Sequence, residues 1–105
     1  MDIQLKRGIL DACVLAVLVK EDSYGYKIIK DLSGHIEISE STLYPILKRL
    51  ESSNCLIVQS VEHNGRLRKY YKITPQGRQK ILDFLEEWEQ MADICEFIKG
   101  EIDDE

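Results

Sequence analysis

The basic side chains of residues 66–72 are the part of this sequence best suited to binding an anion. The stretch "RLRKYYK" holds two arginines and two lysines around a pair of tyrosines: Arg66, Arg68, Lys69 and Lys72. Guanidinium and ammonium groups bind phosphate oxygens, and arginine also enters the minor groove of DNA. We therefore expect Arg66 to reach a minor groove and Arg68 and Lys69 to hold phosphates. The alternative is a solvated, charged strand edge that keeps molecules from pairing.

A second polar group lies within the stretch "ISESTLYPILKRL". The stretch predicts a helix that begins at Ser39 or Ser41, with Ser39 favoured as the N-cap. Its apolar residues recur at helical spacing and form one buried stripe of Leu43, Ile46, Leu47 and Leu50. The opposite face and its flanks hold Ser41, Thr42, Tyr44, Pro45, Lys48, Arg49 and Ser52.

This outward face has the chemistry of a helix that reads a DNA groove. Hydroxyl and ammonium groups bond base edges or phosphates, and a tyrosine or proline ring can contact a thymine methyl group. A proline in a helix interior costs about 3 kcal/mol. An outward position that faces the groove explains why Pro45 is tolerated. The alternative is that Pro45 ends a disordered first turn.

Two helices must precede and position this one. Helical periodicity covers residues 5–20 and residues 22–34, with Asp22 or Ser23 as the N-cap of the second helix. Helix N-termini favour phosphate, so the hydroxyl of Tyr24 or Tyr26 near that start could donate a hydrogen bond to one. The other interpretation is that Tyr24 and Tyr26 pack as core aromatics, and the sequence does not separate the two interpretations.

A hairpin and a long helix follow. Residues 55–74 form two strand-like halves around the turn signal Asn64–Gly65, which predicts a β-hairpin. Thr74 as N-cap and Pro75 at the first helical position predict the start of the final helix. The predicted fold class is therefore mainly α with a small β-hairpin: a winged helix-turn-helix plus a long C-terminal dimerisation helix.

The long helix carries a continuous apolar side. Steps of four and three residues connect Ile81, Leu85, Trp88, Ala92 and Cys95. Such a heptad-like seam is typical of helices that pair. A three-helix core is too small to cover it, and a second copy of the chain is the simplest partner. Trp88 is either a side chain of the dimer core or the wall of a pocket that stacks an aromatic or cationic ligand.

Charge and composition restrict the function classes. The chain of 105 residues has a net charge of −5, but residues 61–80 carry +5 and residues 81–105 carry −9. A local basic patch steers binding to phosphates even when the whole chain is acidic. The three cysteines lack metal-ligand or disulfide spacing. No catalytic, cofactor or metal motif, signal peptide or membrane span is evident, so we expect a cytoplasmic protein that is not an enzyme and has no metal site or cofactor.

Three segments together resemble the PadR-type winged-helix transcriptional regulators: "YGYKI", "STLYPILKRLE" and "GRLRKYYKIT". The resemblance covers roughly residues 5–98 and is closest to the short class, which has one C-terminal helix. It implies residues 1–74 as a winged helix-turn-helix DNA-binding domain and residues 75–100 as the dimerisation helix. Residues 101–105 are expected to form a disordered acidic tail.

The resemblance also implies roles for individual residues. Groove contacts would fall to Ser41, Thr42, Tyr44, Pro45, Lys48 and Arg49. Phosphate or minor-groove contacts would fall to Arg66, Arg68, Lys69 and Tyr70, with secondary phosphate contacts from Tyr24 and Lys27. The dimer would form through Leu5, Ile9, Ile81, Leu85, Trp88, Ala92 and Cys95, with Trp88 beside a small aromatic or cationic effector.

We expect a sequence-specific DNA-binding regulator, a homodimeric repressor on an inverted-repeat operator in double-stranded DNA. In this hypothesis a small aromatic ligand at the dimer interface releases it. The alternative is a winged-helix protein-interaction module without specific DNA binding. The basic hairpin argues against that alternative, because its charges suit phosphate.

Overall fold

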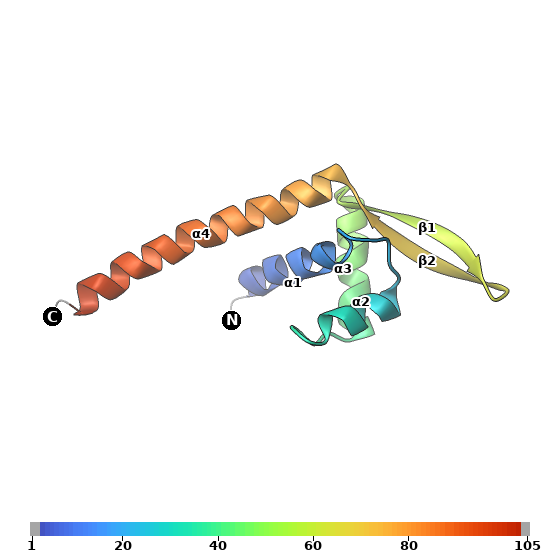
Figure 1. The fold of residues 1–105 in the computed structure, drawn as a ribbon, viewed down its shortest axis with the longest axis horizontal. Coiled ribbons are helices and arrows are strands. Elements are labelled where there is room, and N and C mark those ends of the chain that lie inside the picture. Colours follow the sequence, from blue (N-terminus) through green and yellow to red (C-terminus); the bar gives the residue numbers. More distant parts are fainter. Residues whose placement is uncertain (1–2, 104–105) are drawn as a thin grey trace.

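The computed structural model describes residues 3–103, which form four helices and one two-stranded antiparallel hairpin. In chain order these elements are α1 (Ile3–Val17), α2 (Gly25–Leu32), α3 (Glu40–Ser52), β1 (Leu56–His63), β2 (Arg66–Ile73) and α4 (Pro75–Asp103). The molecule measures 67 × 26 × 22 Å, because α4 and the hairpin project from opposite ends of the body (Figure 1). The predicted fold class is confirmed as mainly α with a small β-hairpin, followed by a long C-terminal helix.

The core lies where α1, α2 and α3 meet the root of the hairpin. Its members are apolar and almost fully inaccessible, among them Val14, Leu15, Ile28, Leu43 and Leu56. The predicted stripe of α3 is buried in full, as 3.6-residue periodicity requires. Burial of this stripe fixes which face of α3 points outward.

The ends of the first three helices agree with prediction at the start of α3 and depart from it in α1 and α2. Ser39 is the N-cap of α3, as predicted, and its hydroxyl accepts the amide of Thr42 at 3.3 Å. Helix α1 ends at Val17, three residues before the predicted end. The predicted N-cap of α2 at Asp22 or Ser23 is wrong, because Tyr24 holds that position without a side-chain cap. Ser23 instead pairs with Tyr71 of β2 through two backbone hydrogen bonds of 2.7 and 3.1 Å.

The hairpin turns at the predicted dipeptide. Asn64 and Gly65 have φ values of 52° and 77°, the pair of positive angles that a tight type I′ turn requires. His63 pairs with Arg66, and Leu56 pairs with Ile73 at the other end. This register sends alternate residues to opposite faces and so decides which basic side chains act together.

Helix α4 begins directly after the hairpin, at Pro75, and extends to Asp103. The hydroxyl of Thr74 accepts the amide of Gly77 at 3.0 Å, which confirms the predicted cap. Gly77 is the buried residue of this helix. The helix continues through residues 101–103, which were expected in the disordered tail, while residues 104–105 lie outside the described part. Within residues 3–103, none of the helices is apolar over a length sufficient to span a bilayer.

Candidate nucleic-acid interface

The outward face of α3 is a surface of hydroxyl, amine and ring groups. All five of its central predicted residues are exposed: Ser41, Thr42, Tyr44, Pro45 and Lys48. Ser39 Oγ lies 2.8 Å from Ser41 Oγ and 3.2 Å from Thr42 Oγ1, so the hydroxyl groups form a cluster at the start of the helix. Pro45 has no amide to donate, which leaves the Ser41 carbonyl without its helical partner. Donors and acceptors thus concentrate in the first turn and a half.

Arg49 does not join that surface. Its guanidinium forms an ion pair with Asp11 of α1, whose side chain is 6% exposed. Lys80 of α4 approaches the same carboxylate at 3.9 Å. A flank position on α3 and a long side chain let Arg49 reach inward to this acid. Sequence periodicity could not reveal it, because the partner lies 38 residues away.

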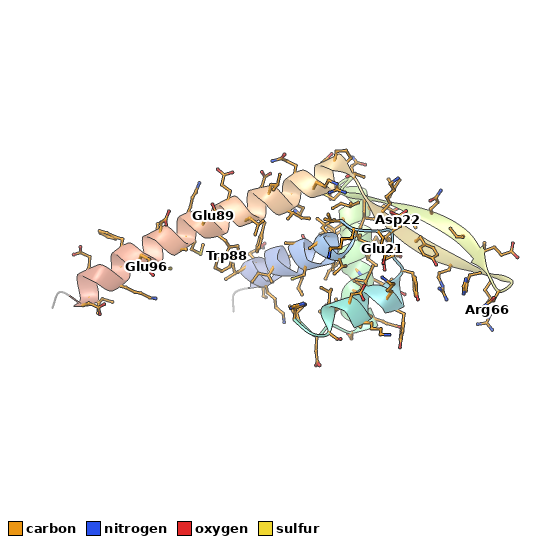
Figure 2. The ribbon with its side chains drawn as sticks, viewed as in Figure 1. Glu21, Asp22, Arg66, Trp88, Glu89 and Glu96 are labelled. Carbon is orange, nitrogen blue, oxygen red and sulfur yellow. The ribbon has the colours of Figure 1, made fainter. Side chains whose placement is uncertain are left out.

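The hairpin divides its basic residues between two faces. Direct pairing across the strands places Arg66, Arg68, Tyr70 and Lys72 on one face with His63. Lys69 lies on the other face, together with buried Tyr71. Arg66 stands at the tip, the point of the hairpin farthest from the core (Figure 2). This hairpin, β1 and β2 together, is called the wing below. It carries cations both at its tip and on the side toward α3.

Tyr24 connects the start of α2 to this wing. The guanidinium carbon of Arg68 lies 4.1 Å above the centre of the Tyr24 ring, within the range of a cation–π contact. Tyr24 also meets Tyr70 edge-on, with ring centres 5.5 Å apart. Tyr26, by contrast, is 67% exposed. Of the two tyrosines, Tyr24 is the one that packs, and what it packs against is a basic side chain of the wing.

Lys27 is engaged by acids. Its ammonium lies 2.5 Å from Glu21 and 3.2 Å from Asp31, and these hydrogen bonds raise the pKa of Lys27 above its ordinary value, Glu21 contributing most. A phosphate would have to compete with two carboxylates for this ammonium. Lys27 is therefore less available for a phosphate contact than the cations of the wing are.

A cleft joins α3 to the wing. One hollow of about 360 Å³ lies between Tyr44, Lys48, Val58 and Lys69, and a second of about 310 Å³ continues along Tyr24, Gly25 and Arg68. Gly25 matters because a Cβ there would lie 2.6 Å from the Tyr44 hydroxyl oxygen. Sequence reasoning missed Gly25, although its place between two tyrosines in "YGYKI" was a signal. The two predicted DNA-facing segments thus form one continuous surface.

A separate hollow lies between α1 and α4. It has a volume of about 400 Å³ and is lined by Gln4, Leu5, Gly8, Phe84, Glu87, Trp88 and Met91. Trp88 lies beside the start of α1 (Figure 2) and meets Phe84 edge-on at 6.1 Å. Leu5 and Trp88, both predicted to lie at the dimer interface, therefore line the same hollow. The hollow is predominantly apolar, with one acidic residue, Glu87, at its edge.

The remaining predicted dimer residues separate into two groups. Ile81 packs against the chain's own core, and Ile9 is half-buried. Leu85, Ala92 and Cys95 are exposed. Helix α4 continues past the start of α1 toward its own C-terminal end (Figure 1). The exposed fractions of Leu85, Ile94 and Ile98 are 50%, 59% and 49%. Among the described residues 3–103, no other element covers these side chains.

Three helices followed by a basic β-hairpin define the class of winged helix-turn-helix proteins. The sequence model described as "Transcriptional regulator PadR-like family" matches residues 14–83. An uncharacterized protein X of Lysinibacillus sphaericus is 32% identical over 100 residues, which cover 90% of this chain and 92% of the relative. The chain belongs to the PadR-like family of transcriptional regulators, which is not a class of enzymes.

Solved structures support the same assignment. A PadR family transcriptional regulator from Eggerthella lenta superposes with a TM-score of 0.80 at 34% identity, over 91% of this chain and 86% of that one. The Bacillus subtilis PadR structure, in complex with operator DNA, has a TM-score of 0.69 at 24% identity, over 73% of this chain and 46% of that one. At that identity the second likeness concerns the fold alone.

Proposed function

We propose that this PadR-like regulator binds a specific DNA sequence through α3 and the wing. The observation that carries the proposal is the continuous surface on which the hydroxyl-rich face of α3 adjoins the cations of the hairpin. The polar side chains at the start of α3 have the chemistry to bond base edges, and the rings of Tyr44 and Pro45 suit thymine methyl groups. The fold neighbour from Bacillus subtilis was solved with operator DNA.

Phosphate contacts complete the proposed interface. Arg66 at the tip would enter a minor groove, and Arg68, Lys69 and Tyr70 would hold the backbone. Tyr24 would orient Arg68, because the stacked ring restricts where the guanidinium can go. Lys27 would be a secondary contact. Arg49 is not included among the proposed DNA contacts, because its guanidinium is already paired with Asp11.

We further propose a homodimer formed through α4 and α1. The support is the row of exposed apolar side chains on α4, which is larger than isolated surface hydrophobes account for. At 100° per residue, Leu85 falls on the side of α4 that carries Trp88, Ala92 and Cys95, and Ile94 and Ile98 form a neighbouring stripe. The acids Glu86, Glu89 and Asp93 lie on the flank away from that stripe. Glu89 and Glu96 along α4 are visible in Figure 2. A two-fold dimer would present two copies of α3 to an inverted repeat and act as a repressor by occupying it.

The hollow beside Trp88 supports a small effector as a second function. Its aromatic walls suit a flat aromatic compound, and Glu87 would favour one with positive charge. Titration of a planar cationic dye should quench Trp88 fluorescence if the hollow binds such ligands. No quenching of the wild-type protein would contradict this assignment, and so would unchanged affinity of the Trp88→Ala protein for the dye, measured by the anisotropy of the dye's own fluorescence.

The DNA proposal is tested by selection from a random duplex pool. Purified protein is incubated with the pool, bound duplexes are amplified, and the enriched sequences are read. The proposal predicts an inverted repeat whose half-sites lie about one helical turn, or 10 base pairs, apart. Retention of DNA without enrichment in any round would contradict sequence-specific binding. No retention at low salt would favour the interaction module instead.

A further inference from the structure

Asp11 is a buried acid at the junction of three helices. It belongs to α1, its residue exposure is 5%, and its two carboxylate oxygens face different partners. Oδ1 is paired with the guanidinium of Arg49 from α3, and Oδ2 lies 3.9 Å from the ammonium of Lys80 from α4. Among the residues that the structure describes, these are the ion pairs that connect the groove-facing helix to α4 across α1.

Lys80 also stands next to the hollow beside Trp88. It lies one helical turn before Phe84, and both residues line a small hollow that they share with Gly8 and Glu87. Gly8, Phe84 and Glu87 line the Trp88 hollow as well. A displacement of α4 against α1 at that hollow must therefore carry Lys80 with it, because α4 is one continuous helix from Pro75 to Asp103.

We propose that Asp11 is a positioning residue through which α4 sets the orientation of α3. With Lys80 in place, the carboxylate is held from the α4 side and fixes the guanidinium of Arg49. Arg49 is the immediate neighbour of Lys48 on α3, so its anchoring determines how the exposed face is turned. The inference rests on the proposed DNA binding and adds to it a route from the dimerisation helix to the reading helix.

The competing explanation is that the cluster only stabilises the fold. Two kinds of measurement separate the explanations. Lys80→Met removes the ammonium but keeps a long apolar stem, and Lys80 is 44% exposed, so the variant should fold. Lys99→Met removes the same charge from the same helix and is the matched control, because Lys99 is 72% exposed and its ion-pair partner is Glu96. Lys80→Arg retains the charge.

The first measurement is fluorescence anisotropy on the duplex enriched from the random pool, repeated over a series of salt concentrations. We expect Lys80→Met to lower affinity at least about fivefold, the lower range of coupling between sites. The slope of log affinity against log salt should not change, because each lost phosphate contact would reduce it by about 0.9 and Lys80 makes none. Lys99→Met and Lys80→Arg should bind within about twofold of the wild type.

The second measurement is amide hydrogen exchange of the free protein, followed by mass spectrometry. The proposal predicts faster exchange in peptides of α3 for Lys80→Met and not for Lys99→Met, because exchange reports local opening. In an Asp11→Asn background, Lys80→Met should reduce DNA affinity no further, since the route is already interrupted.

Several results would overturn the inference. Lys80→Met could bind as the wild type does, reduce the salt slope by about 0.9 as a phosphate contact would, or change exchange in α4 alone. A full further loss of affinity in the Asp11→Asn background would equally exclude Asp11 as the route. A wild-type protein that binds no duplex would overturn the proposed function and this inference together, which distinguishes that failure from the others.

Discussion

Replacement of Gly77 by alanine should destabilise the protein, although alanine is the better helix former. Gly77 occupies the first turn of α4 at the root of the wing. A Cβ built there would lie 2.2 Å from the carbonyl oxygen of Cys55 and 2.7 Å from Cγ1 of Ile73. The carbonyl is part of the backbone and cannot rotate away. Helix α4 or the start of β1 would have to move by about 1 Å to restore a normal carbon–oxygen contact of about 3.3 Å.

The magnitude follows from three contributions. Helix propensity favours alanine by at most about 1 kcal/mol. Overpacking against rigid neighbours costs about 3 kcal/mol, the upper part of its usual range. The displaced Cys55 carbonyl also accepts the amide of Thr74 at 3.1 Å, and weakening that hydrogen bond costs about 1 kcal/mol. The net loss is about 3 kcal/mol, or roughly 10–20 °C in Tm for a domain of this size.

Thermal unfolding followed by circular dichroism measures this loss at a fixed protein concentration. Gly100→Ala is the matched control on the same helix, because a Cβ there meets nothing within 4 Å. The control should leave Tm unchanged or raise it slightly. A Gly77→Ala protein that melts at or above the wild-type temperature would refute the packing argument.

Three further predictions concern single side chains. Pro45→Ala should raise Tm, since a proline in a helix interior costs about 3 kcal/mol, and should change the sequences that a random pool enriches; an unchanged preference would remove Pro45 from the interface. Tyr24→Leu should weaken DNA binding about two- to fivefold, the value of an exposed cation–π contact of about 0.5–1 kcal/mol, with anisotropy as the assay and equal binding as the contrary result. Burial raises the pKa of the Cys13 thiol above its ordinary value, so less of it is thiolate at pH 8 in the folded chain. With the other two cysteines replaced by alanine, it should react with a thiol reagent more slowly in buffer than in urea, and equal rates would contradict this.

Local signals account for what the sequence predicted correctly. The cap at Ser39, the turn at Asn64–Gly65 and the cap at Thr74 each depend on residues within a few positions of one another. The buried stripe of α3 follows from periodicity alone. These features place the exposed face of α3 and the wing without knowledge of the rest of the chain.

Contacts between distant segments account for what the sequence could not predict. Ser23 appeared to be a helix cap because serine favours that position, yet its backbone pairs with Tyr71 of β2 instead. Arg49 appeared to face the groove, yet a buried acid on α1 draws it inward. Both outcomes depend on partners more than thirty residues away, which single-sequence periodicity does not reveal. The extension of α4 to Asp103 reflects another limit, since an acidic tail is compatible with either helix or coil.

The most direct test of the central claim is the affinity of the wild-type protein for its enriched duplex, compared with a scrambled duplex of equal length, over a range of salt concentrations. We expect a preference for the enriched duplex of at least about a thousandfold, as is typical of specific regulators. We also expect a steep loss of affinity as the salt concentration rises, because several wing cations would contact phosphates. Equal affinity for both duplexes, or no binding to either at low salt, would contradict it.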